Sequence, residues 1–254
     1  MPIQLYRSGL FIGYDKQEGN PLNLVSGNKN KEGQGRVYPF GTKQKAIFIS
    51  RCIYLSEIAD WKPKTFILTY NSDYVQDTKS HINYFLTRLR RGDLCDREKP
   101  TKKKPVKYAY SLEFTDKGQF HYHFLVDHPF IDPVKASNIW SQARGYHSRN
   151  AVTGLDTLKD PVASAFYASK YFAKAKSGSQ YLERGKSLRF WATSNNICGS
   201  ETFTIPDKNP DGTRNEIGKI VQDNAIFTKE MDFYTKGFIK TREAIRIFQE
   251  NYSF

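Results

Sequence analysis

The sequence predicts an α+β fold, because strand-like segments and segments of helical periodicity both occur along it. Residues 106–114 and 119–127 are two strand-like runs in direct succession, which indicates a hairpin and therefore an antiparallel pair. Residues 78–91 carry apolar side chains at helical spacing and end at Gly92. The hydrophobic fraction of 39%, with 18 Phe and 16 Tyr, is enough to build a core around these elements.

The remaining elements are expected around this hairpin and helix. The segment LYRSGLFIGY predicts an N-terminal strand, followed by a long exposed loop to about residue 46. Further along, we expect core strands at 65–70 and 188–194, helices at 133–143 and from Asp160-Pro161 to about 177, and a basic helical tail at 230–254.

The charge balance indicates a polyanionic partner. The chain has 39 Lys and Arg against 26 Asp and Glu, a net charge of +13, and nucleic acid is the commonest polyanion that such proteins bind. Charge alone does not separate this from a merely solubilising surface. The basic run within 87–107 is best interpreted as a solvated loop, with a dedicated DNA contact as the alternative. No apolar run is long enough for a membrane span and no secretory signal is present, and the three cysteines form no disulfide pattern. We therefore expect buried thiols and a cytoplasmic protein.

The hairpin carries two histidines that share one face of a strand. Side chains alternate along a strand, so His121 and His123 point the same way, about 7 Å apart. A two-residue turn at 117–118 would pair Glu113 with Tyr122 and direct the carboxylate to the other face. A three-residue loop ending at Gly118 pairs Glu113 with His121, and loops of this kind favour glycine at their third position. The turn chemistry therefore favours Glu113, His121 and His123 on one face.

Two imidazoles and one carboxylate are a possible metal site. Such a mixed set suits Mg²⁺ or Mn²⁺ as well as Zn²⁺. The alternative is a half-buried strand whose histidines are hydrogen-bonded locally. A metallo-hydrolase motif of the His-x-His-x-Asp-His kind is disfavoured, because the spacing to Asp127-His128 is two residues too long.

The helix expected after Pro161 has one polar aromatic face. At 100° per residue, Tyr167, Lys170, Tyr171 and Lys174 form one stripe, and apolar residues occupy the opposite side. A surface helix with packed tyrosine rings and snorkelling lysines would give the same pattern. Together with a metal site, however, the stripe offers a nucleophile, because a divalent ion on a phosphate oxygen makes phosphorus more electrophilic toward a phenol.

Three motifs in this order resemble the HUH endonuclease superfamily. TFILTY at 65–70 is similar to the first strand motif of that superfamily, HYHFLV at 121–126 to its two-histidine motif, and YASKYFAK at 167–174 to its two-tyrosine helix. The segment IWSQARGYHSRNAV is similar to the connection between motifs in initiators of small single-stranded DNA phages of the microvirus or inovirus kind; plasmid initiators are similar too. Tyr122 stands where an aliphatic residue is usual.

The resemblance implies a rolling-circle replication initiator that nicks and rejoins one DNA strand through a 5′-phosphotyrosine intermediate. It implies a central antiparallel sheet of about five strands with flanking helices, an RRM-like palm, over which the tyrosine helix lies. Carried over by position, Glu113, His121 and His123 hold Mg²⁺ or Mn²⁺, Tyr167 is the first nucleophile, Lys170 positions the phosphate and Tyr171 serves a second transfer. Lys174, Lys176 and Arg189 are expected to contact DNA.

The resemblance also divides the chain. We expect an N-terminal extension over 1–60, an HUH nuclease core over 61–200, and a basic, largely helical extension over 201–254. Since no phosphate-binding loop of an ATPase is present, we expect a helicase of a bacterial host as a partner. The resemblance implies two more partners, single-stranded or melted origin DNA and a host polymerase that extends the released 3′ hydroxyl.

Two other functions fit parts of this pattern. A tyrosine transposase or mobilisation relaxase would use the same chemistry, although relaxases commonly place their tyrosines before the histidines. A single-stranded DNA binding protein without catalysis would use its aromatic and basic residues alone, and would leave the Glu-His-His set unexplained.

Overall fold

The computed structural model describes most of the chain, in two compact units. The described residues are 3–6, 8–14, 42–70, 78–95, 105–114, 119–146, 151–158, 191–197, 202–206, 208, 210–213, 215–231, 234–238, 243–244, 246–247 and 250. One unit comprises 1–36, 41–54 and 198–254, and the other comprises 37–40 and 55–197.

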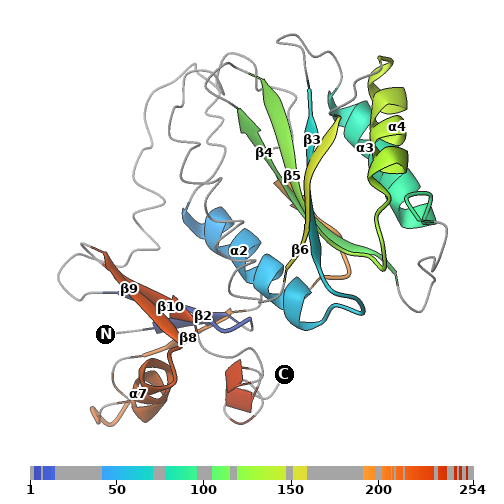
Figure 1. Ribbon diagram of the computed structural model, residues 1–254. Coiled ribbons are helices and arrows are strands. Elements are labelled where there is room, and N and C mark those ends of the chain that lie inside the picture. Colours follow the sequence, from blue (N-terminus) through green and yellow to red (C-terminus); the bar gives the residue numbers. More distant parts are fainter. Residues whose placement is uncertain are drawn as a thin grey trace, which may run out of the picture. The chain divides into compact units, whose positions relative to one another are not determined.

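The unit formed by 55–197 is built on a five-stranded antiparallel sheet (Figure 1). Its strands are β3 (Lys64–Thr69), β4 (Lys107–Phe114), β5 (Phe120–Asp127), β6 (Val152–Thr157) and β7 (Trp191–Thr193). They lie in the order β6-β3-β5-β4-β7, so the β4–β5 hairpin supplies adjacent inner strands. The predicted α+β fold with such a sheet is confirmed, and so are the strands expected at 65–70, 106–114 and 119–127; β6 was not predicted.

Helices α3 (Thr78–Arg91) and α4 (Pro133–Arg144) lie side by side against one face of this sheet (Figure 1). Helix α3 buries its apolar positions and ends at Gly92, whose φ of 76° is a left-handed conformation that glycine adopts easily. Helix α4 begins after Asp132, whose carboxylate accepts hydrogen bonds from the amides of Val134 and Lys135. Both helices agree with the predicted bounds to within one residue.

The two faces of the sheet differ in chemistry. Alternate side chains of β4 and β5, including Tyr110, Tyr122 and Phe124, belong to the aromatic core that contains α3 and α4. The intervening positions, among them Ser111, Glu113 and His123, point to the opposite face and are also buried. Buried polar and ionisable side chains are therefore concentrated on the face of the sheet opposite α3 and α4.

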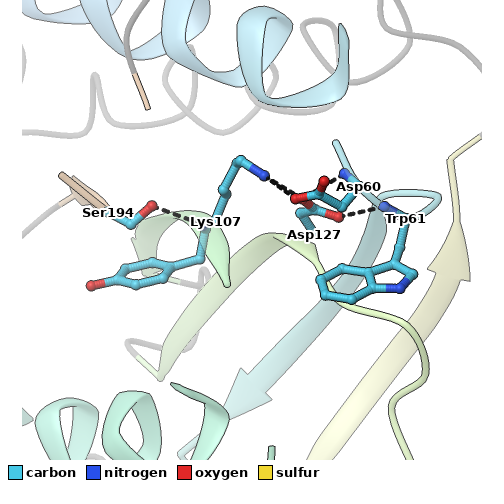
Figure 2. A network of polar contacts seen from close by, with 6 residues as sticks. Asp60, Trp61, Lys107, Asp127 and Ser194 are labelled. Carbon is cyan, nitrogen blue, oxygen red and sulfur yellow. Dashed lines mark hydrogen bonds and ion pairs between the residues drawn. The ribbon is translucent and has the colours of Figure 1, made fainter. Parts of the chain in front are cut away.

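A buried ion pair lies at the opposite end of the hairpin from Glu113. Lys107 and Asp127 are partners across β4 and β5, with 3.0 Å between Nζ and Oδ2. Figure 2 shows the Asp127 carboxylate between this ammonium and the backbone of Asp60 and Trp61, in the loop that leads into β3. The amides of Asp60 and Trp61 donate to its two oxygens at 2.9 and 2.8 Å. Through these hydrogen bonds, Asp127 at the end of β5 holds the loop that precedes β3.

The next residue, His128, is a buried histidine that the fold keeps neutral. Its side chain is fully buried, and Nδ1 donates a hydrogen bond of 2.8 Å to the carbonyl oxygen of Phe130. Its Nε2 has no hydrogen-bond partner among the described residues. Burial lowers the pKa of His128 to about 4, and the neighbouring charge of Lys64 acts in the same direction.

We expect His128 to make the protein sensitive to acid. Because its pKa is lower in the folded than in the unfolded chain, the unfolded chain binds more protons below about pH 6.5, and stability falls as the pH falls from there toward 4. The His128→Asn variant, whose amide can still donate to Phe130, should lose less stability on acidification, by on the order of 2 kcal/mol between about pH 7 and pH 4.5. Urea unfolding at both pH values measures this, and equal losses in the two proteins would contradict it.

The other unit contains a second five-stranded sheet; the sequence predicted a strand near LYRSGLFIGY, which the structure divides into two strands, but it did not predict the sheet. Its strands, all antiparallel, are β1 (Ile3–Tyr6), β2 (Leu10–Tyr14), β8 (Thr202–Ile205), β9 (Phe227–Met231) and β10 (Tyr234–Phe238), in the order β8-β1-β2-β10-β9. Its core includes Ile3, Leu5, Ile205 and Val221, the last from helix α7 (Glu216–Asp223). Residues from both ends of the chain thus form one sheet.

The predicted helical tail at 230–254 is wrong where it overlaps this sheet. Strand β9 includes 230–231 and strand β10 occupies 234–238. Strand β10 pairs with β2, more than two hundred residues earlier in the sequence, and such long-range pairing overrides local helix propensity. Helix α2 (Thr42–Glu57), of which 42–54 belong to this unit, also replaces part of the expected loop. The division of the chain at 60 and 200 stays a prediction.

Two of the three cysteines lie in the described part of the chain. Cys52 and Cys95 are buried and form no disulfide within the described part of the chain, and burial raises the pKa of the Cys52 thiol. Cys198 lies outside the described residues.

Candidate metal centre

The register of the hairpin brings the predicted ligands together. Glu113 of β4 is the direct partner of His121 of β5, and Ser111 is the partner of His123. This is the register that the three-residue loop predicts, and the alternative pairing of Glu113 with Tyr122 is excluded; residues 115–118 themselves lie outside the described part of the chain. Tyr122 faces away from the ligands, in the aromatic core, as predicted.

Glu113, His121 and His123 form a compact cluster of donor atoms. One ligand atom from each residue lies within 4.8 Å of the others. Glu113 and His123 are buried, with exposed fractions of 6% and 5%, and His121 is half-buried. The Nε2 of His123 and the Oε2 of Glu113 are 2.6 Å apart, in a hydrogen bond. The cluster lies on β4 and β5, two neighbouring inner strands of the sheet that Figure 1 shows.

The cluster fits a divalent cation. Nitrogen and oxygen ligands lie about 2.0–2.2 Å from such a metal, so neighbouring donors of one ion lie about 3.0–3.4 Å apart. As the ion replaces the shared proton, the distance between Glu113 Oε2 and His123 Nε2 would increase from 2.6 Å by a few tenths of an ångström. The ligand atom of His121 lies within 4.8 Å of the other two, so it needs to move only a short way toward them. Two imidazoles and one carboxylate leave further positions open for substrate oxygen.

Electrostatics favour the ligand form of His121. Its burial lowers its pKa, the neighbouring His123 lowers it further, and Glu113 acts in the opposite direction. At neutral pH this imidazole is therefore neutral, and a neutral imidazole is the form that binds metal.

Two side chains of α4, Trp140 and Arg144, hold the end of β3 next to His121; we call this pair the clamp. Thr69 is the partner of His121 across β3 and β5. Its carbonyl oxygen accepts hydrogen bonds from Trp140 Nε1 at 3.0 Å and from Arg144 Nη1 at 2.9 Å, both on α4. Its amide donates to Ala151 at 3.0 Å. The sequence prediction missed this clamp, since neither side chain has a spacing signature, although Gly145 marks the end of their helix.

The predicted residues of the tyrosine helix cannot be compared with the cluster. Residues Tyr167, Lys170, Tyr171, Lys174, Lys176 and Arg189 lie outside the described part of the chain, so their roles stay predictions.

The described residues define a class of protein: an α+β domain with a two-histidine, one-carboxylate centre on the inner strands of an antiparallel sheet. Residues 64–176 match the model of one family, replication-associated protein ORF2/G2P. The match begins at β3 and includes the hairpin and the segment with the tyrosine stripe. It confirms the resemblance to replication-associated proteins and is consistent with a rolling-circle initiator.

The other comparisons add no relative. No curated protein and no solved structure matches the chain significantly. Within the described ranges, every helix is too short or too polar to cross a membrane.

Proposed function

We propose that the protein is a rolling-circle replication initiator, an endodeoxyribonuclease that nicks and rejoins single-stranded origin DNA through a covalent 5′-phosphotyrosine. The observation that carries the proposal is the Glu113-His121-His123 cluster, which lies within the segment that matches a replication-associated family. The net charge of +13 suits a DNA substrate. A DNA-binding role without catalysis is disfavoured, because it would leave this cluster unexplained.

In the proposed reaction, Tyr167 supplies the nucleophile. Its phenolic oxygen gives up its proton and attacks the scissile phosphorus, the bond from phosphorus to the 3′ oxygen breaks, and the departing 3′ oxygen takes up a proton to become the 3′ hydroxyl. Lys170 is three residues after Tyr167, about one turn of the expected helix, and directly precedes Tyr171; its charge would stabilise the phenolate and the phosphate. Tyr171 would accept a second strand in the joining step.

Glu113, His121 and His123 would hold a divalent cation, Mg²⁺ or Mn²⁺, which withdraws charge from the scissile phosphate. Before the ion binds, the hydrogen bond between the buried Glu113 carboxylate and His123 would hold that imidazole in the cluster, so that both groups are already placed as ligands. We place the reaction in the cytoplasm of a bacterial host, with a host helicase and polymerase extending the released 3′ hydroxyl.

Covalent capture of DNA tests the proposal. Incubation with labelled single-stranded origin DNA and Mn²⁺ should give a protein–DNA adduct that resists denaturation, and peptide mapping should find the DNA on Tyr167. Tyr167→Phe with Tyr171→Phe should remove the adduct completely, because phenylalanine keeps the ring and loses the nucleophilic oxygen. An adduct of normal yield in the double variant would refute the assignment. Chelator-insensitive, salt-sensitive binding without any adduct would instead favour the binding protein.

A further inference from the structure

Arg144, a buried arginine at the C-terminal end of α4, has no role in the proposed reaction. Only 7% of its surface is exposed. Arginine remains protonated in proteins, so a full positive charge is held in the interior. Within the described residues no carboxylate forms an ion pair with it, which is unusual, because buried charges are ordinarily paired.

Three hydrogen bonds, a ring contact and the helix dipole offset part of the cost. Nε donates to the Trp140 carbonyl at 3.3 Å, and Nη1 donates to the Thr69 carbonyl and to the Tyr146 hydroxyl, each at 2.9 Å. The Tyr146 ring stacks on the guanidinium, 4.1 Å from ring centre to Cζ. The carbonyl end of α4 adds a favourable dipole.

These interactions leave one guanidinium nitrogen unused. Nη2 is buried and has no hydrogen-bond partner among the described residues. A buried donor without an acceptor costs free energy, and on a charged group the cost is higher. The guanidinium therefore has an unfilled capacity for an anion at Nη2, whose hydrogens can be donated to a phosphate oxygen; Nη1 could join it only if Tyr146 gave up its hydrogen bond.

The location of Arg144 relates this capacity to the metal cluster. Its Nη1 binds Thr69, and Thr69 is the direct cross-strand partner of His121. Neighbouring strands are about 4.8 Å apart, so Arg144 and the cluster lie at the same end of the sheet, on opposite faces of β3 and β5. A DNA single strand that passes over this end of the sheet could contact Arg144 and the metal cluster within a few nucleotides. Tyr146, which covers the guanidinium, is itself 37% exposed.

We propose that Arg144 binds a second, non-scissile phosphate of the DNA strand that the Glu113-His121-His123 centre holds. The inference rests on the proposed nicking function for the identity of its ligand. It makes Arg144 a binding residue that fixes the register of the strand, so that one particular phosphate reaches the metal centre. Tyr146 moves aside or stacks on a base as the strand enters.

The test measures binding of single-stranded origin DNA as a function of salt, by fluorescence anisotropy, for wild type, Arg144→Gln and Arg246→Gln. Arg246 is the charge-matched control, because it is exposed in the other unit and pairs with Glu243 and Glu250. We expect Arg144→Gln to weaken binding about tenfold, and to lower the salt slope by about 0.7, as loss of one phosphate contact requires. Affinity and slope equal to those of the control would overturn the inference.

A second measurement identifies the phosphate and does not depend on a folded variant. Single neutral methylphosphonates are placed along the DNA, one position at a time. We expect wild type to lose affinity at one position near the scissile phosphate, and Arg144→Gln, where its near-ultraviolet circular dichroism is native, to be indifferent to that position. A wild-type scan without any sensitive position beside the scissile one would overturn the inference. If wild type forms no covalent adduct yet shows this sensitive position, the nicking function fails while the phosphate site stands.

Discussion

Replacement of His123 by alanine should abolish covalent adduct formation, with a loss of rate of about 10³-fold or more. The side chain is one of three donors on two strands, and it is buried against Glu113. A carboxylate and one remaining imidazole would bind a divalent ion much more weakly. Glu113→Gln should act in the same direction, because the amide keeps the size of the side chain and loses its charge.

The measurement has two parts. Binding of Mn²⁺, followed by electron paramagnetic resonance or calorimetry, should weaken in parallel with the adduct yield, and higher Mn²⁺ should rescue Glu113→Gln in part. Glu57→Gln is the matched control, since Glu57 is exposed at the end of α2 and lies outside the cluster. A normal adduct yield in His123→Ala would show that the cluster is structural, and the proposed nicking centre would then be wrong.

The hairpin was predictable because its signals are local. Alternation assigns His121 and His123 to one face, and the preference of a short loop for Gly118 selects the register that pairs Glu113 with His121. The ends of α3 and α4 follow from local residues too, Gly92 for one helix and Asp132-Pro133 for the other. These features depend on contacts between residues that are close in sequence.

The second sheet depends on contacts that no local pattern specifies. Strand β1 pairs with β8, which lies about two hundred residues later, and β2 pairs with β10. Short strands such as these have weak individual propensities, and the basic residues around 229–246 resemble those of an exposed helix. The clamp of Trp140 and Arg144 on Thr69 was missed for the same reason, because only the packing of α4 against β3 brings them together.

Asp127→Ala should be among the most destabilising single substitutions in the unit formed by 55–197, and should lower its free energy of unfolding by about 3–5 kcal/mol. The Asp127 side chain is fully buried and accepts hydrogen bonds from the amides of Asp60 and Trp61 and from the Lys107 ammonium. Burial alone would lower the pKa of Lys107, but hydrogen bonds to Asp60 and Asp127 and their charges more than offset it, so the net shift is upward. Removal of Asp127 would leave two amide donors without acceptors and a largely buried charge with one partner.

Comparison of single and double variants separates the pair from its surroundings. Lys107→Met should cost less than Asp127→Ala, because Asp127 keeps both amide donors, and Asp60→Asn should cost at most about 1 kcal/mol, since the Asp60 carboxylate is 31% exposed. The double variant Lys107→Met with Asp127→Ala should be more stable than the sum of the single losses predicts, because neither change then leaves an uncompensated charge. Urea unfolding of the four variants measures these free energies, and strict additivity would show that Lys107 and Asp127 stabilise the hairpin independently.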